Sequence, residues 1–146
     1  MSFPANADTP GVVRLSAALL LLRGASSMAF LYHGSGILFG AFGGPGPVQF
    51  ADSHHWPSVI AYMVGLAQVA GGMAILSGAL FRLGAASVAI VMLGAISLVH
   101  LRYGFDVSSG GAEYALTQLL VAIALLLTGP GEYSLRSCLP VALQKW

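Results

Sequence analysis

The sequence predicts an all-α membrane protein, a bundle of four transmembrane helices. The first observation is composition: 57% of the residues are hydrophobic and only 8% are charged, whereas a soluble domain is about 25% charged. The second is the grouping of the apolar residues into four runs, three of which have the roughly 17 to 20 residues that cross a bilayer core. We therefore expect the 146 residues to form a single integral membrane domain.

The apolar runs predict the helices in chain order. Arg23 and His33 are the only interruptions of the first run, and the second and third contain no charge. The fourth run, from Tyr114 to Thr128, would be only about 22 Å long as a helix, so we expect it to begin upstream and to bring Glu113 to the membrane boundary. The predicted helices cover about residues 13–38, 58–80, 83–102 and 111–128.

The connections follow from turn chemistry. The short "FRLG" between the second and third runs predicts a tight antiparallel hairpin around Arg82. The stretch "GAFGGPGPVQFADSHHWP" is rich in Gly and Pro, which favours an irregular loop over another helix. We expect outer loops over about residues 40–57 and 103–110.

Basic residues near the ends of the runs predict the orientation, because cytoplasmic loops carry an excess of Lys and Arg. Arg102 is expected at one end of the bundle and four basic residues at the other, so both termini should be cytoplasmic, in the inner membrane of a prokaryote. The segment before the first run has no obvious cleavage site, so we expect an uncleaved anchor. The four basic residues are Arg14, Arg82, Arg136 and Lys145.

Several function classes are excluded. A formal net charge of +1 gives no basic patch for nucleic acid, and the single cysteine, Cys138, excludes a thiol-disulfide exchange enzyme. His54 and His55, with Asp52 nearby, suggest a metal site. Adjacent histidines in an extended loop point in opposite directions, however, so we expect a solvated loop and no metal.

Small residues are expected at the helix contacts, since helices in lipid associate through close packing. Gly65, Gly72 and Gly78 mark the second run, and Ser87, Gly94 and Ser97 mark one side of the third. We interpret these positions as packing positions.

The ionisable residues within the runs are candidate site residues. Arg23 is ten residues inside the first run, where a charge is costly in lipid, and Gln68 is its candidate partner. Two roles are open for this arginine: it could hold helices together as a buried clamp, or it could contact a ligand.

A second polar group is expected at the outer end of the bundle. His33, His100 and Glu113 fall at one depth on three different helices, beside Tyr32, Tyr103 and Tyr114. Each residue alone could belong to an aromatic belt or a helix cap. Their convergence within an apolar bundle predicts a site for a small molecule.

Five stretches, in this order and spacing, resemble the DoxX family of small four-helix membrane proteins: "LYHGSGILFGAFGGPG", "GLAQVAGG", "VHLRYGF", "GGAEYAL" and "TGPGEYSL". The resemblance covers residues 15 to 135. The sequence departs from the family pattern at Ile37 and Gln68, where relatives often have lysine and glutamate. The resemblance implies a membrane partner of redox enzymes, including thiosulfate:quinone oxidoreductases and oxidative-stress complexes. The polar positions that it carries over are Arg23, His33, His100, Glu113 and Tyr114.

The resulting hypothesis is a membrane subunit of a quinone-linked oxidoreductase. Glu113 and His100 are the candidate catalytic residues, and the quinone would be bound by Arg23, His33, Gln68, His100 and Tyr114. Two histidines at one depth could also ligate haem. Equal depth alone is weak evidence for a haem site, so we do not expect haem. The alternative is a non-catalytic anchor or assembly subunit whose polar residues only fix the bundle.

Overall fold

The computed structural model describes residues 9–146, and these are all-helical, with no strand among them. The prediction of an uncleaved anchor concerns residues that lie largely outside this range. The all-α class is confirmed. The main helices are α1 (Pro10–Phe39), α2 (Gly46–His54), α3 (Ser58–Ser77), α4 (Phe81–Ala95) and α5 (Glu113–Thr128).

Three helices are long and apolar enough to cross a membrane: α1, α3, and α4 together with its continuation through a π turn and a 3-10 turn to Tyr103. α5 is also apolar but has only 16 residues. Its role as a fourth span stays a prediction. The tight hairpin is confirmed, since only three residues separate α3 from α4.

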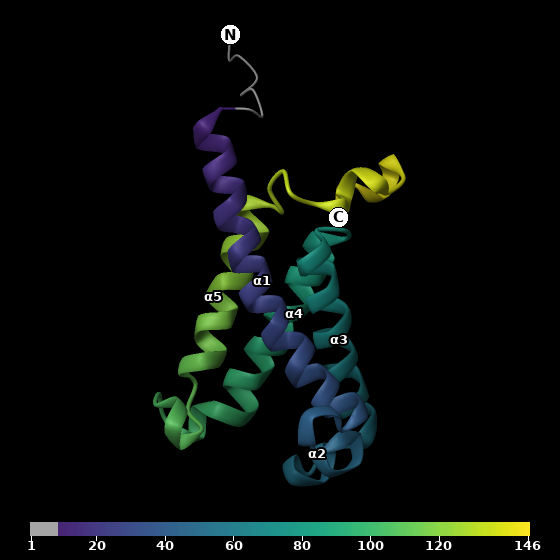
Figure 1. Ribbon diagram of the computed structural model, residues 1–146. Helices are drawn as coiled ribbons and strands as arrows, with labels where there is room; N and C mark the ends of the chain where they lie inside the picture. The colour runs from purple at the N-terminus through teal and green to yellow at the C-terminus, as the bar shows by residue number, and fades with distance from the viewer. Residues whose placement is uncertain (1–8) are drawn as a thin grey trace.

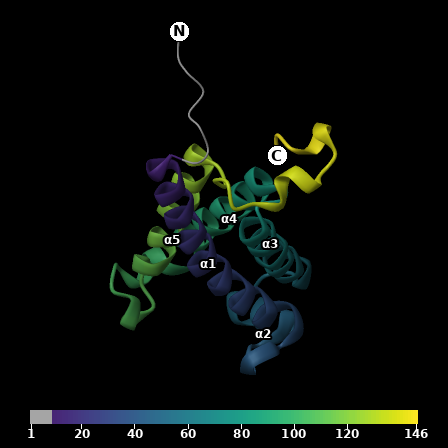
Figure 2. The same ribbon diagram turned by 45° about the horizontal axis from the view of Figure 1, so that its top comes forward.

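The helices pack in chain order, α1 on α3, α3 on α4 and α4 on α5 (Figure 1). α1 and α5 touch much less, and their lower halves diverge in Figure 1, as they do in the turned view of Figure 2. We call the line where α1 faces α5 the α1–α5 seam. It is the weakly packed side of the bundle.

The bundle has two chemically different ends. We call the end with α2 and the loop over residues 104–112 the loop end. The opposite end contains the α3–α4 turn and the residues after α5, and we call it the basic end.

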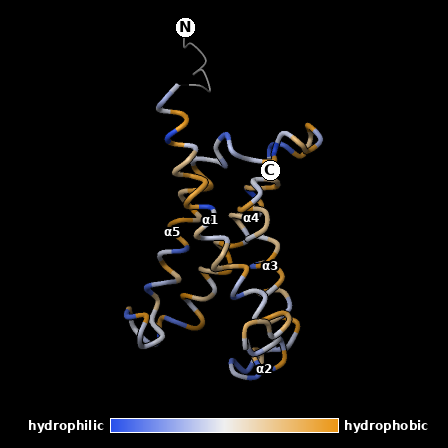
Figure 3. Tube along the Cα trace, in the orientation of Figure 1, coloured by the Kyte–Doolittle hydropathy of each residue, from blue (hydrophilic) through white to orange (hydrophobic). Residues whose placement is uncertain are grey.

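Along the helices between the two ends the chain is predominantly hydrophobic (Figure 3). The largest fully buried apolar side chains form the core: Phe30, Ile75, Phe81, Val88 and Leu125.

Glycine allows α1 and α3 to approach closely. A Cβ added at Gly34 would lie 2.8 Å from a methyl of Val69 and 3.0 Å from the carbonyl oxygen of Gly65. A Cβ at Gly65 would lie 2.7 Å from Leu38. These distances confirm the packing role predicted for Gly65. Gly94, by contrast, has open space beside it.

The prediction of an irregular loop between the first two spans was wrong, because α2 forms there. Pro47 stands in the first turn of α2, where proline is tolerated since no helical N–H partner is required. The following residues contain no helix breaker. Ala51 is fully buried against Ile37 and Ala61, so the helix is held by a small core of its own.

The two adjacent histidines lie at the end of α2 rather than in an extended loop. The ring of His54 stacks on Trp56, with 4.8 Å between ring centroids, and also contacts Phe50. His55 ends the helix in the left-handed region, with φ of 57°. The histidines therefore take part in ending the helix and in an aromatic cluster.

Candidate functional site

Arg23 lies at the basic end and is almost completely buried, at 1% exposure. Its Nε donates to the carbonyl oxygen of Ile75 at 2.8 Å, and its Nη2 to that of Leu76 at 2.6 Å. Its Nη1 donates to Pro130 at 2.8 Å and to Tyr133 at 2.6 Å. One side chain thus joins α1, the last turn of α3 and the segment after α5.

The guanidinium acts as a cap for α3. The last four carbonyls of a helix lack helical partners, and a positive charge near them is favourable. The planar fork of arginine matches several acceptors at once, which lysine cannot do. Arg23 therefore has the geometry of a buried clamp, one of the two roles that the sequence left open.

Gln68 is not the partner of Arg23. The arginine contacts α3 at Ile75 and Leu76, about two turns further along the helix. Gln68 is buried at 6% exposure and packs against Gly34. Its amide makes no hydrogen bond within residues 9–146. Arg23 stands near the middle of α1, as the sequence predicted, but at the level of the last turn of α3, because α1 extends well beyond α3 in that direction.

The two candidate catalytic residues bind the loop that precedes α5. Nδ1 of His100 lies 2.7 Å from the carbonyl oxygen of Gly110, and Oε2 of Glu113 accepts from the backbone N–H of Val107 at 3.2 Å. Both groups are occupied by backbone atoms of the same loop. No hydrogen bond or ring contact within the described chain joins either of them to His33.

The same loop contains an aspartate cap. The carboxylate of Asp106 accepts a hydrogen bond from the backbone N–H of Ser108 at 2.8 Å and begins a 3-10 turn. These hydrogen bonds with Ser108 hold the pKa of Asp106 below its ordinary value. The loop before α5 is therefore organised by three side chains, those of His100, Asp106 and Glu113.

The α1–α5 seam brings His33 and Tyr114 together, as their shared depth predicted. Their ring centroids are 6.1 Å apart. Nε2 of Gln118 donates to the hydroxyl oxygen of Tyr114 at 3.3 Å, and Oε1 of Gln118 accepts from Ser26 at 2.9 Å. A row of polar groups thus follows the seam.

Ser26 and Gln118 were missed by the sequence analysis. The signal that could have found Gln118 is its spacing of four residues from Tyr114, which places both on one face of α5. Ser26 gave no comparable signal, because a serine in a transmembrane helix is common at packing positions.

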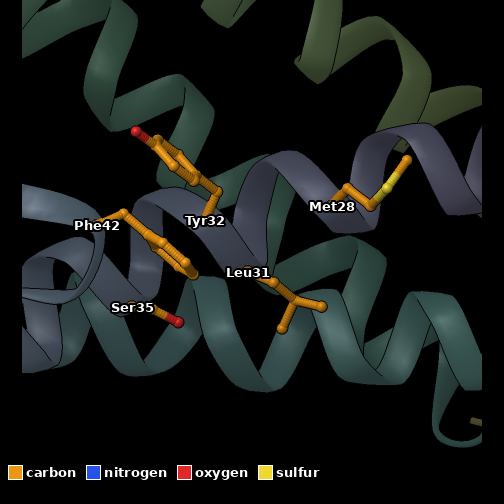
Figure 4. A pocket seen from close by; sticks show the side chains of 5 residues that line it. All are labelled: Met28, Leu31, Tyr32, Ser35 and Phe42. Carbon is orange, nitrogen blue, oxygen red and sulfur yellow. The ribbon is translucent and has the colours of Figure 1, made fainter.

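An aromatic surface continues from the seam around α1. The ring of Tyr32 meets that of His33 edge-on at 5.3 Å and stacks on Phe42 at 5.1 Å, with 19° between the planes. Figure 4 shows Tyr32 and Phe42 beside a shallow hollow of about 310 Å³ on the surface of α1. Met28, Leu31 and Ser35 complete its lining.

The fold defines an integral membrane protein, and the comparisons with known proteins agree. Residues 18–101 match the family model described as DoxX. A relative from Bacillus subtilis (strain 168), named "Putative oxidoreductase CatD", is 34% identical over 110 residues, which cover 75% of this chain and 78% of the relative. The chain therefore belongs to the DoxX family. No solved structure matches it significantly.

Proposed function

We propose that this chain is the membrane subunit of a quinone-linked redox complex and that a quinone head group binds at the loop end of the α1–α5 seam. The binding residues are His33 and Tyr114, with Tyr32 and Phe42 as an aromatic platform. Arg23, which the sequence analysis included in the site, is not part of the proposed site, because its hydrogen bonds are made within the fold.

The observation that carries the proposal is the state of the Tyr114 hydroxyl. Its oxygen accepts from Gln118, and no hydrogen bond from its own proton is found within residues 9–146. Neither ring nitrogen of His33 is hydrogen-bonded within residues 9–146. Two donors are therefore available at one place beside lipid, where an unsatisfied polar group is costly. The two carbonyl oxygens of a quinone are acceptors of matching chemistry.

The surroundings suit the rest of such a ligand. Aromatic rings stack on flat conjugated rings, and Tyr32 and Phe42 offer an exposed pair. The hollow lined by Met28 and Leu31 faces the opposite side of α1 from His33 and is not part of the proposed site. His33 and Tyr114 are both exposed on the lipid-facing surface of the bundle, so an isoprenoid tail would lie in the bilayer.

A bound quinone accepts electrons and protons, and the chain offers a carboxyl group for proton exchange. Glu113 immediately precedes Tyr114 and is partly exposed at the loop end. Glu113→Gln preserves an acceptor for Val107 but removes the titration, so we expect intact assembly and slower quinone reduction by the complex. Full turnover of this variant at all pH values would remove Glu113 from the proposal.

The orientation belongs to the same proposal. Among residues 9–146, four exposed cations and one acid, Glu132, lie at the basic end, whereas the loop end has Arg102 and three acids. By the positive-inside rule, the basic end faces the cytoplasm in this proposal. The proposal also takes α5 as a fourth span and the membrane as the inner membrane of a prokaryote. The quinone site then lies on the outer side.

The test is quinone binding by the purified chain in vesicles of phosphatidylcholine. Tyr114→Phe removes one hydrogen bond and should weaken binding about tenfold, the equivalent of about 1.4 kcal/mol. Tyr62→Phe is the matched control, because Tyr62 is an exposed tyrosine on α3. Equal affinities for both variants and the unmodified chain would refute the proposed site.

An anchor or assembly subunit is the second candidate. It is favoured by one observation: Arg23, His100 and Glu113 are all satisfied by backbone groups of the chain itself. Purification from native membranes separates the candidates. A stoichiometric partner enzyme with bound quinone supports the first proposal, and a partner without quinone supports the second.

A further inference from the structure

The segment after α5, residues 133–146, is attached to the basic end at two points. Near its start, the carbonyl oxygen of Tyr133 accepts from Arg23, and Ser134 lies against Gly78 in the α3–α4 turn. At Trp146 the carbonyl oxygen accepts from the backbone N–H of Arg82. Between these points the segment extends sideways from the bundle (Figures 1 and 2).

The segment has an ordered fold of its own. Two 3-10 turns, Leu135–Cys138 and Val141–Leu143, follow one another. The side-chain amide of Gln144 donates to the carbonyl oxygen of Leu139 at 2.8 Å and closes the second turn. These turns and this hydrogen bond define the path of the segment's backbone.

Large apolar side chains of this segment are exposed, although the bundle lies beside it. Val141 is 84% exposed, the highest value among the exposed large hydrophobic residues of the described chain, and Leu135 is 57% exposed. Leu143 and Trp146 are also more than 40% exposed. In water such exposure is unfavourable, since apolar surface is stabilised when it is removed from water.

The position of the segment places these side chains at the membrane boundary. α3 has 20 residues and is therefore about 30 Å long, the thickness of the hydrocarbon core. A core that begins at Ser58 would then end at Ser77, the last residue of α3. Because the segment contacts Gly78 and Arg82, it lies at the level of the lipid head groups.

The charges of the segment are basic. Arg136 and Lys145 are both exposed, and Nζ of Lys145 lies 5.2 Å from the ring centroid of Trp146. Arg14 and Arg82 add positive charge at the same end, against Glu132 as the single acid among the described residues there. Tryptophan with lysine and arginine is the combination that favours the interface, and basic clusters attract anionic lipids.

We propose that residues 133–146 form an interfacial anchor that inserts Val141, Leu143 and Trp146 among the lipids and binds anionic phospholipid head groups through Arg136 and Lys145. The occupant of this surface is the anionic bilayer that surrounds the bundle. The anchor is independent of the quinone site, which lies at the opposite end of the molecule.

The fluorescence of Trp146 provides the test. The chain contains two tryptophans, so Trp56→Phe leaves Trp146 as the single emitter. This variant is reconstituted in phosphatidylcholine vesicles with and without phosphatidylglycerol, using lipids brominated near the head group or near the chain end. Both leaflets have one composition, so the direction of insertion does not affect the result.

We expect stronger quenching of Trp146 by shallow bromines than by deep ones, and a further increase when phosphatidylglycerol is present. Arg136→Gln with Lys145→Gln should abolish the increase and leave the quenching in pure phosphatidylcholine. Arg102→Gln, at the loop end, is the matched control and should keep the full increase. The thermal midpoint of each variant verifies folding.

Two results would overturn the proposal. Absence of quenching by either lipid would mean that Trp146 faces water or protein. Equal quenching with and without phosphatidylglycerol, in a folded protein, would mean that the segment does not recognise anionic lipid.

Discussion

The Nε of Arg23 on α1 donates a 2.8 Å hydrogen bond to the carbonyl oxygen of Ile75 in the last turn of α3. Three further hydrogen bonds from the same guanidinium reach Leu76, Pro130 and Tyr133. These acceptors come from two segments separated by more than fifty residues. The arginine therefore fixes the end of α3 and the chain after α5 to α1.

Replacing Arg23 should destabilise the protein in the absence of any ligand. Each carbonyl left buried without a donor costs about 1 to 3 kcal/mol, so Arg23→Leu should lower the free energy of unfolding by about 3 kcal/mol or more. Arg23→Lys keeps the charge but not the planar fork, so its free energy of unfolding should lie between those of Arg23→Leu and the unmodified chain. The thermal midpoint in detergent measures the effect.

Arg14→Leu is the matched control, because Arg14 is an exposed arginine on the same helix. Its midpoint should be that of the unmodified chain. If Arg23→Leu were as stable as this control, the clamp would contribute nothing measurable.

Gly34 should not tolerate a methyl group. A Cβ at Gly34 would lie within 3.0 Å of Val69, Gln68 and Gly65, so Gly34→Ala should cost about 1 to 3 kcal/mol through overpacking. Gly24, also on α1, has nothing within 4 Å, and Gly24→Ala should be neutral or stabilising by up to about 1 kcal/mol. Chemical denaturation in mixed micelles compares the two. Equal effects would contradict the close α1–α3 contact.

The helices could be predicted from the sequence because long apolar runs are a strong signal. α2 could not, since Gly46 and Pro47 are typical of loops, and its formation depends on the burial of Ala51 against residues from α1 and α3. Helix α4 shows a smaller difference: a π turn over Ile96–His100 interrupts it before the predicted end.

The candidate site was predictable only in part. The proximity of His33 and Tyr114 followed from their depth in an antiparallel bundle. The acceptors of Arg23 are backbone carbonyls, which every residue has, so no side-chain pattern could reveal them. His100 and Glu113 have the expected depth, but the loop over residues 104–112 supplies backbone partners that the sequence does not disclose.

The turn after Asp106 should depend on pH. The pKa of this carboxyl is depressed in the folded chain, so its contribution to stability is present above the ordinary value of 3.8 and is lost as the pH falls through the lower, folded value. The hydrogen bond from the backbone N–H of Ser108 should weaken in that acidic range, because its acceptor loses its charge, and the NMR chemical shift of this N–H reports the change. Asp106→Asn keeps an acceptor oxygen without a titration, so its Ser108 signal should not change there. A transition in both proteins would exclude Asp106 as the source.

The orientation can be tested with introduced cysteines. Cys138→Ser gives a cysteine-free background, since Cys138 is the single cysteine of the chain. In intact cells an impermeant maleimide should label Ser53→Cys and Ser108→Cys at the loop end, and should label Ser137→Cys only after lysis. The reverse pattern would place the basic end outside and contradict the positive-inside assignment.

The most direct test of the quinone site is photolabelling of the reconstituted chain with an azido-quinone, followed by peptide mapping. The proposal predicts label on α1 between Met28 and Phe42 and on the start of α5 near Tyr114. An excess of unmodified quinone should remove this label, and Tyr114→Phe should reduce it. Label that excess quinone does not displace, or label concentrated away from the α1–α5 seam, would contradict the quinone site.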